Sequence, residues 1–386
     1  MTVSSGREPV IVAAVRTPIG KHNGFFKDTR ADELGVIAIQ ALLERTRISP
    51  SEIEDVVFGC VTGRGEQGFN VARIIALEAG LPIESAGVTV NRLCGSSQQA
   101  IHFAAQEILA GVCDCAIAGG VESMTREPMG SDLDKPLNPK LLARYEIVHQ
   151  GEAAERIADR WRISREELDE FSLQSHLKAA HAQDAGYFES QIVPVTLNNR
   201  TLKHDEGVRR YASPEEGRAK LAQLAPVFRP GIGKITAGNS SQISDGAAAL
   251  LLMTREKAKA LGYKPMARFR AWAVAGVDPT IMLTGPIPAT KKALHKAGLT
   301  LKDIDLFECN EAFAPVPIAW GRELDVPWER VNVNGGAIAH GHPLGATGAI
   351  LFTKILYELE RRDAQFGLVT MCIGFGQGIA TVLERL

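Results

Sequence analysis

The sequence lacks the features that mark several classes of protein. No apolar run approaches the roughly 18 residues that a membrane-spanning helix needs, so we expect no membrane span. The apolar run over positions 10–15 ends at Arg16 without a small-residue cleavage site, which argues against a secretory signal. The final Glu-Arg-Leu is not a peroxisomal address of the Ser-Lys-Leu type. These absences favour a cytoplasmic location.

Cysteine and net charge are also scarce. Six cysteines in 386 residues are too few for a disulfide scaffold, and the Cys113/Cys115 pair has no partner pair at zinc-site spacing, so we expect no metal. A formal charge of −2 leaves no global field for a polyanion, which argues against a nucleic-acid partner. No phosphate-loop pattern is present. The thiols are expected to be reduced, so an unusually placed cysteine is a candidate for chemistry.

The apolar pattern predicts an α/β fold. Strands are expected over 9–15, 53–58 and 115–120, and helices over 31–43 and 96–111, where Gly111 is the predicted stop. Residues 121–235 are more polar and contain a predicted helix over 164–186 that starts with the capping box of Ser164 and Glu167. We expect this segment to be an insertion over the main fold.

The second half of the chain repeats the first. The segment LLERTRISPSEIEDVVF (42–58) matches ALHKAGLTLKDIDLFEC (293–309) in a helix end, a turn and a strand. Glycine-rich turns at 91–97 and 332–348 each lead into a helix and then a buried strand ending in glycine. A repeat this long is not a solenoid period. It predicts two similar halves around a pseudo-twofold axis, with equivalent turns facing one site.

Cys94 is the first candidate for catalysis. It lies between a predicted strand and the N-terminus of the helix over 96–111. Unpaired N–H groups and the helix dipole at that end are expected to lower the thiol pKa and favour the nucleophilic thiolate. The alternative is a buried structural cysteine, because free cysteine is among the most buried residue types.

Three residues in the second half are further candidates. His342, in GHPLGATG, is placed to act as a general base, or else is hydrogen-bonded within its turn; His340 is a less favoured competitor that is expected to point elsewhere. Cys372 lies at the end of the predicted strand over 366–371, where α/β folds place their sites. Asn310 follows another strand and is suited to holding a water or donating to an oxyanion.

Five motifs occur in order, NRLCGSSQQA, TAGNSSQISDGAA, NEAFA, GGAIAHGHPLGATGA and CIGFGQG, and together they resemble the thiolase family of acyl-CoA acetyltransferases over essentially the whole chain. The resemblance implies that Cys94 is the acylated nucleophile and that His342 activates it. Cys372 would be the second acid/base, and Asn310 would hold the water of a first oxyanion hole. The backbone N–H groups of Cys94 and Gly374 would form a second hole.

The resemblance also implies a domain organisation and a ligand. The expected N-terminal half comprises residues 1–120 and 236–265, the loop domain that covers CoA comprises 121–235, and the C-terminal half comprises 266–386. Arg209 matches the arginine at the adenine end of CoA, with a solvated surface charge as the alternative; Ser241 and His149 match residues near the pantetheine arm. Coenzyme A would be a co-substrate, with no permanently bound cofactor. Thiolases form dimers or tetramers, so a homodimer or homotetramer is expected.

The implied activity is degradative thiolysis of 3-oxoacyl-CoA by a ping-pong mechanism. The alternatives are a biosynthetic acetoacetyl-CoA thiolase, a decarboxylating ketoacyl synthase and a non-catalytic acyl-CoA or lipid-binding relative. Cys372 stands where the synthase would need a second histidine, and the non-catalytic reading predicts a lost catalytic residue. Gln150, Leu283 and Phe375 depart from the usual family pattern near the expected acyl end. Their effect on chain length stays open.

Overall fold

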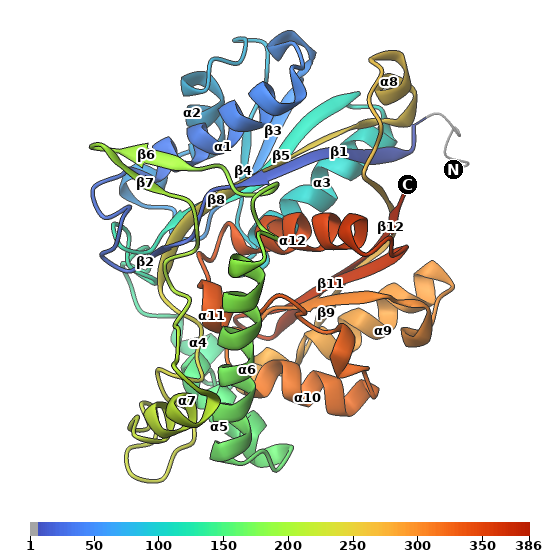
Figure 1. Ribbon diagram of the computed structural model, residues 1–386. Helices are drawn as coiled ribbons and strands as arrows, with labels where there is room; N and C mark the ends of the chain where they lie inside the picture. The colour runs from blue at the N-terminus through green and yellow to red at the C-terminus, as the bar shows by residue number, and fades with distance from the viewer. Residues whose placement is uncertain (1–6) are drawn as a thin grey trace.

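One mixed β-sheet runs through the computed structural model, which describes residues 7–386 (Figure 1). The first six positions, where the N-terminal segment considered as a secretory signal begins, lie outside the described residues. The strand order is β10-β11-β12-β9-β1-β8-β5-β3-β4, and β2 also pairs with β8. The strands are β1 (Pro9–Arg16), β2 (Gly20–Lys21), β3 (Asp55–Gly59), β4 (Val88–Val90), β5 (Cys115–Ser123), β8 (Ser244–Thr254), β9 (Ala267–Gly276), β10 (Leu306–Cys309), β11 (Phe366–Ile373) and β12 (Gln377–Arg385).

The sheet consists of two halves with the same internal order. In the first half β1 is antiparallel to β8, β8 is antiparallel to β5, and β5 is parallel to β3. In the second half β9, β12, β11 and β10 repeat that series of pairings. The halves meet where β1 runs antiparallel to β9, at the pairs Val10↔Arg268 and Ile11↔Ala267. This arrangement is the predicted pair of similar halves around a pseudo-twofold axis; the domain boundaries given above stay a prediction.

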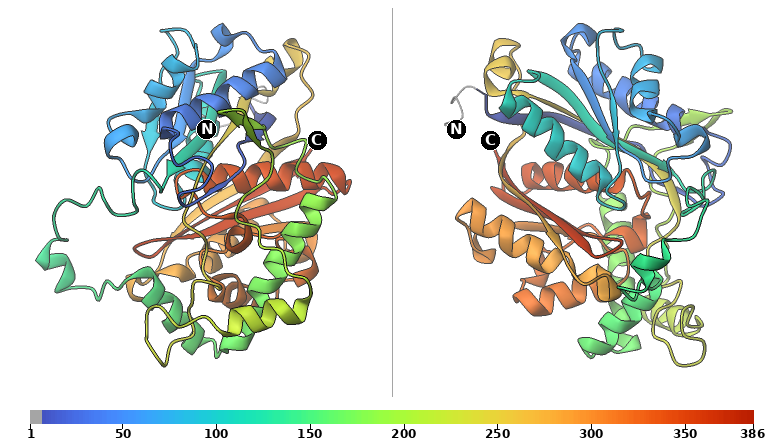
Figure 2. Two further views of the ribbon diagram at one scale, coloured as in Figure 1. Left: turned by 60° about the vertical axis from the view of Figure 1, so that its left-hand side comes forward. Right: turned by 180° about the vertical axis from the view of Figure 1, so that it is seen from behind.

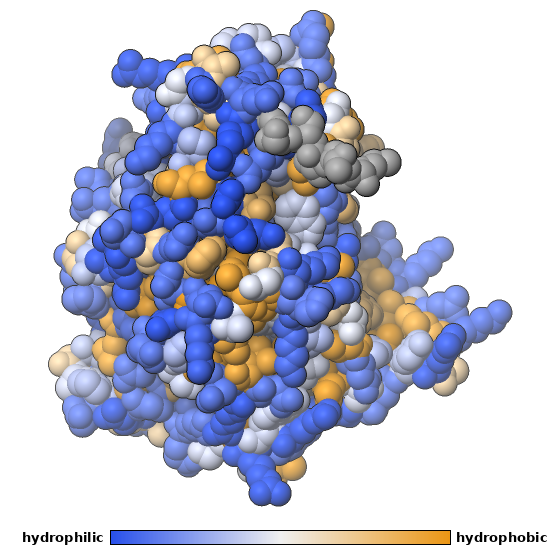
Figure 3. All heavy atoms as spheres, turned by 90° about the vertical axis from the view of Figure 1, so that its right-hand side faces the viewer, coloured by the Kyte–Doolittle hydropathy of each residue, from blue (hydrophilic) through white to orange (hydrophobic). Residues whose placement is uncertain are grey.

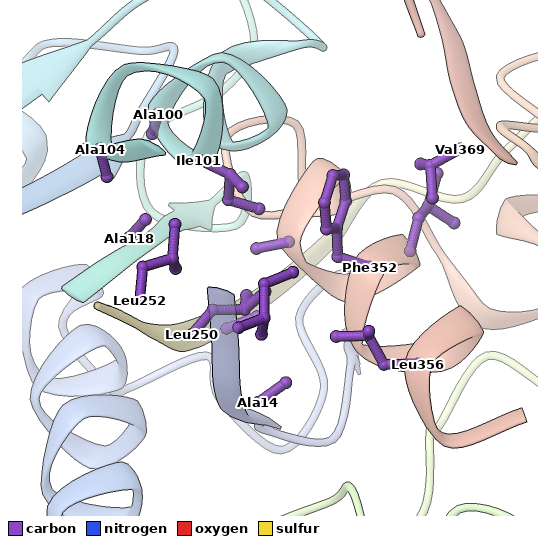
Figure 4. Packing of buried hydrophobic residues seen from close by; sticks show 14 of the residues in the cluster. Ala14, Ala100, Ile101, Ala104, Ala118, Leu250, Leu252, Phe352, Leu356 and Val369 are labelled. Carbon is purple, nitrogen blue, oxygen red and sulfur yellow. The ribbon is translucent and has the colours of Figure 1, made fainter. Parts of the chain in front are cut away.

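Two equivalent helices lie at the centre of the molecule. Helix α3 (Ser96–Ala110) buries the predicted apolar stripe and ends at Gly111, whose φ of 79° is readily adopted only by glycine. Helix α12 (Thr347–Arg361) is the helix predicted to follow the second glycine-rich turn. Figure 4 shows Ile101 of α3 and Phe352 of α12 within one buried cluster that also contains Leu250 of β8. The core is therefore shared between the halves, and it fixes α3 relative to α12.

The other helices cover the sheet or belong to the insertion. Helix α6 begins after Ser164, whose side chain accepts a hydrogen bond from the Glu167 N–H at 3.2 Å, so Ser164 is the predicted N-cap. The Glu167 carboxylate pairs with Arg322 and does not complete the predicted capping box. The helices are α1 (Ala31–Thr46), α2 (Val71–Glu78), α4 (Pro139–Leu142), α5 (Gln150–Arg160), α6 (Arg165–Asp184), α7 (Pro214–Ala222), α8 (Arg255–Ala260), α9 (Pro286–Ala297), α10 (Pro315–Leu324) and α11 (Ala337–His340), with short 3₁₀ turns η1 (Pro50–Glu52), η2 (Gly65–Gln67), η3 (Pro279–Thr284), η4 (Leu301–Asp303) and η5 (Trp328–Arg330).

The segment between β5 and β8 is the insertion. It contains α4–α7 and the hairpin of β6 (Val195–Leu197) and β7 (Arg200–Leu202), and α5–α7 lie along one side of the second half (Figure 1). The stretch that carries α4 extends away from the body as an arm (Figure 2, left). In residues 7–386, no helix has both the length and the apolar character that crossing a bilayer requires.

Candidate active site

Cys94 lies in the turn that joins β4 to α3. Its side chain is almost completely buried, and it belongs to a small apolar cluster with Val61, Met124 and Leu344. Leu344 comes from the turn before α12, so both halves of the chain contribute to the surroundings of this thiol.

The expected lowering of the Cys94 pKa is wrong. Burial raises the pKa of this thiol to about 11, although the backbone N–H groups of Gly374 and of Cys94 itself act in the opposite direction. The cause is desolvation, which disfavours the thiolate more than the turn and its N–H groups favour it. The resting nucleophile is therefore a neutral thiol, and it needs a base to remove its proton.

His342 lies in the turn between α11 and α12, and it is also buried. Its backbone N–H donates to the Gln242 carbonyl at 3.1 Å, and its Nε2 lies 3.4 Å from Asn310 Nδ2. Burial lowers the pKa of His342 to about 4, so the imidazole is neutral at pH 7 and able to accept a proton.

Asn310 follows β10, as predicted, and is buried beside His342. Its backbone N–H donates to the Thr370 carbonyl of the neighbouring strand, and this bond holds the backbone that carries the side chain. Among residues 7–386, Asn310 Oδ1 is a buried acceptor without a hydrogen-bond partner. Such an atom is suited to a donor from a bound molecule.

Cys372 lies in β11 and is completely buried. Burial raises the pKa of Cys372 well above its ordinary value, and negative charge on Cys94 raises it further. The two thiols are thus close enough to influence each other. The turn after β11 places the Gly374 N–H against the Cys94 sulfur. Cys372 is therefore protonated at neutral pH, and a proton donor stands near the nucleophile.

A cavity of about 230 Å³ leads to His342. It is lined by the predicted ligand residues His149 and Ser241, by Gln150 and by the apolar side chains Met124 and Phe228. His149 caps α5 by accepting the Gly151 N–H at 3.1 Å, and its ring stacks on Phe228 with centroids 5.0 Å apart. The cavity therefore joins the insertion to the buried histidine.

Other predicted residues lie away from this cavity. The Arg209 side chain is exposed and does not line it, while its backbone N–H donates to His176 Nδ1 at 3.1 Å. His340 has Nδ1 2.8 Å from Asp205 and Nε2 2.8 Å from the Asn334 carbonyl, so it faces other partners than His342 does. Leu283 packs in the core cluster that contains Cys372.

Phe375 lies in the turn between β11 and β12, and it is 45% exposed. Its φ is 59°, a left-handed conformation that disfavours side chains with a Cβ. The adjacent Gly374 is close to Leu93 and Gln150: a Cβ there would lie 3.1 Å from Leu93 Cδ1 and 3.5 Å from Gln150 Nε2. Gln150 and Leu93 therefore border the site at the turn that carries Phe375.

Sequence reasoning missed Glu122. This carboxylate is fully buried in β5 and accepts hydrogen bonds from the Val61 N–H at 2.9 Å and the Gly345 N–H at 2.8 Å. It also accepts from the Thr62 N–H at 3.0 Å and from Gln67 Nε2 at 2.8 Å. A charged residue inside an apolar strand was the only available signal, and its partners are scattered along the sequence.

Within residues 7–386, no group of three or more His, Cys, Asp or Glu side chains is placed to hold a metal ion. The site contains two thiols, Cys94 and Cys372. The buried Glu122 carboxylate holds the backbone of Val61 and Gly345 beside them. The chemistry that this arrangement supports is nucleophilic attack by a thiol, with a neutral histidine as base and a second thiol as acid.

Comparisons with known proteins agree with this chemistry. The family described as "Thiolase, N-terminal domain" matches residues 9–256, and "Thiolase, C-terminal domain" matches residues 263–385. The chain is 48% identical to a 3-ketoacyl-CoA thiolase of Vibrio vulnificus over 97% of this chain and 99% of that protein. It is also 48% identical to one of Idiomarina loihiensis over 98% and 100%. The crystal structure of the Bacillus anthracis acetyl-CoA acetyltransferase is 39% identical and superposes with a TM-score of 0.90, covering 98% of this chain and 99% of that chain.

Proposed function

The chain belongs to the thiolase family of acyltransferases, and on that premise we propose that it cleaves 3-oxoacyl-CoA with CoA, giving acetyl-CoA and a shortened acyl-CoA. The observation that carries the proposal is that Cys94 and Cys372 lie close enough for charge on one to affect the other, while Leu344, two residues after the neutral His342, packs in the Cys94 cluster. Each thiol lies near a strand end in a different half of the molecule. The names of the relatives favour the degradative direction.

In the first half-reaction His342 takes the proton of Cys94, and the resulting thiolate attacks the 3-keto carbon. The bond between C2 and C3 then breaks, and its electron pair forms the enolate of acetyl-CoA. Cys372 then donates its proton to the enolate carbon. A thiol whose pKa is raised gives up its proton only to a stronger base, and the enolate is such a base. Acetyl-CoA leaves, and the shortened acyl group stays on Cys94 as a thioester.

In the second half-reaction the Cys372 thiolate takes the proton of an incoming CoA thiol. The CoA sulfur attacks the acyl carbon, and the tetrahedral oxyanion accepts hydrogen bonds from the N–H groups of Cys94 and Gly374. Cys94 leaves as a thiolate and recovers its proton from His342. Both thiols are then protonated again, and the two steps through one acyl-enzyme give ping-pong kinetics.

We also propose how CoA binds. The cavity at His149, Ser241 and Gln150 is suited to the pantetheine arm, because it connects the insertion to His342. Arg209, exposed on the insertion, is free to meet the phosphates or adenine outside that cavity. CoA is a co-substrate in this scheme, and no permanently bound cofactor takes part.

A homodimer or homotetramer is the proposed assembly. The arm exposes apolar side chains, including Met129, Leu133 and Leu142, although it extends away from the body (Figure 2, left). One edge of the sheet is β4, where Val88 is exposed. Hydrophobic residues also gather in the middle of the face drawn in Figure 3. Apolar patches and open strand edges of this kind favour contact with another copy. Light scattering after size-exclusion chromatography measures the assembly.

The experiment that tests the function is a chain-length panel. The protein is mixed with CoA and 3-oxoacyl-CoAs from acetoacetyl-CoA upward, and loss of enolate absorbance is followed. Thiolysis of longer substrates is the expected result. Turnover of acetoacetyl-CoA alone, with condensation of acetyl-CoA, would favour the biosynthetic alternative. Binding of acyl-CoA without any turnover would favour the non-catalytic one.

A further inference from the structure

Thr347 lies against the side of His342 that faces away from Asn310. His342 Nδ1 is 2.6 Å from Thr347 Oγ1, while Nε2 is the nitrogen near Asn310. Thr347 is the first residue of α12, and its side chain is buried.

The Thr347 hydroxyl has a second partner, the backbone carbonyl of Pro343. Oγ1 lies 2.8 Å from the carbonyl oxygen of Pro343. This carbonyl also accepts the backbone N–H groups of Ala346 at 2.9 Å and Thr347 at 3.0 Å. The hydroxyl has a single proton, and the bond to Pro343, the one-turn bond of a helical threonine, uses it. With that proton on Pro343, the Thr347 oxygen is the acceptor in its contact with His342, which places a proton on Nδ1.

The consequence concerns the tautomer of the catalytic histidine. A neutral imidazole has one N–H, so a proton on Nδ1 leaves the lone pair on Nε2. The Asn310 Nδ2 group donates, and it faces Nε2 at 3.4 Å, which fits an unprotonated nitrogen there. The opposite tautomer would place two donors against each other and would leave Nε2 unable to accept a proton.

We propose that Thr347 is a positioning residue that fixes His342 in the Nδ1–H tautomer and thereby keeps Nε2 ready to take the Cys94 proton. Once Nε2 holds that proton, the same N–H is able to donate to an oxyanion. The proposal rests on the proposed function for its catalytic meaning. The tautomer itself is a property of the resting protein and is measurable without turnover.

Thr353 provides a matched control on the same helix. Its Oγ1 donates to the Ala349 carbonyl at 2.8 Å, the same one-turn bond that Thr347 makes to Pro343, and it is equally buried. No histidine contacts it in the described hydrogen-bond network. A loss that came only from removing a buried hydroxyl from α12 would therefore appear in both valine variants.

The test compares T347V, T347S and T353V. In protein labelled with ¹⁵N-histidine, the signal that disappears in H342N is expected to show a protonated Nδ1 and an unprotonated Nε2. We expect T347V to lose this signature and to slow iodoacetamide alkylation of Cys94 at pH 7 by about tenfold or more, because wrong-tautomer bases lose most of their effect. Its kcat should fall similarly while KM changes by less than about twofold.

T347S restores the acceptor and is expected to keep the wild-type tautomer and alkylation rate, and T353V to keep both despite a lowered melting temperature. A wild-type spectrum with the proton on Nε2 would overturn the proposal, as would a T347V protein that alkylates at the wild-type rate. If the wild type cleaves no 3-oxoacyl-CoA, the proposed function fails, but the spectrum and the alkylation rates still decide the role of Thr347.

Discussion

Replacing Glu122 with glutamine tests how the two halves are held together beneath the site. One oxygen of this buried carboxylate accepts from Val61, beside Cys94, and from Gly345, in the turn that carries His342. The other oxygen accepts from Thr62 and Gln67. A single side chain thus links the surroundings of the nucleophile to those of the base.

The expected loss of stability follows from those four hydrogen bonds. Glutamine keeps one oxygen, and its amide group would face two N–H donors that lose their acceptor. Two buried donors without partners cost about 2–6 kcal/mol together. Burial raises the pKa of Glu122, so the carboxylate itself carries a desolvation penalty that the neutral amide avoids. We therefore expect E122Q to lower the free energy of unfolding by about 3 kcal/mol.

Urea unfolding measures the loss, and iodoacetamide alkylation of Cys94 shows whether it reaches the site. E155Q is the control, because Glu155 is an equally buried carboxylate that accepts the N–H groups of Lys234 and Ile235 within the insertion. We expect E155Q to lose stability while Cys94 alkylates at the wild-type rate, and E122Q to change both. An E122Q protein that unfolds at the wild-type urea concentration would refute the reasoning.

Two further predictions concern Phe375 and His342. F375G should leave the free energy of unfolding within about 1 kcal/mol of the wild-type value, because relief of the positive-φ strain is offset by the larger backbone entropy of glycine and by loss of the partly buried ring. It should change the ratio of kcat/KM between long and short 3-oxoacyl-CoAs, and an unchanged ratio would remove Phe375 from the acyl site. The pKa of His342 is about 4 in the folded protein and about 6.5 in the unfolded chain, so the unfolded chain binds more protons between these pH values. Acidification from pH 7 to 5 should therefore lower the free energy of unfolding by about 2 kcal/mol through this residue. Urea unfolding at both pH values should show that much less pH dependence in H342N than in the wild type, and equal dependence would contradict the assignment.

Much of the architecture was predictable because the pattern is regular. The apolar stripe of α3, the Ser164 cap and the repeat between the halves are local features that the sequence displays directly. The positions of Cys94, His342 and Cys372 were also predictable, since each lies in a glycine-rich turn or at a strand end; the catalytic roles given to them stay predictions. The repeat predicted that equivalent turns of the two halves face one site. The influence of Cys94 on the pKa of Cys372 is consistent with that prediction.

The rest depended on burial and on distant partners. The wrong direction for the Cys94 pKa came from weighing the helix N-terminus without knowing that the sulfur is desolvated. Glu122 was missed because its four donors are spread from Val61 to Gly345. The role proposed for Thr347 needs two distances from one hydroxyl, which no sequence pattern contains.

Whether Cys94 carries the acyl group is measured by mass spectrometry of peptides from the full-length protein. A 3-oxoacyl-CoA is added without CoA, and the reaction is quenched in acid before digestion. The account predicts one shortened acyl group on the peptide that contains Cys94, one equivalent of acetyl-CoA released, and neither product from C94A. An acyl group on Cys372 instead, or full thiolysis by C94A, would contradict it.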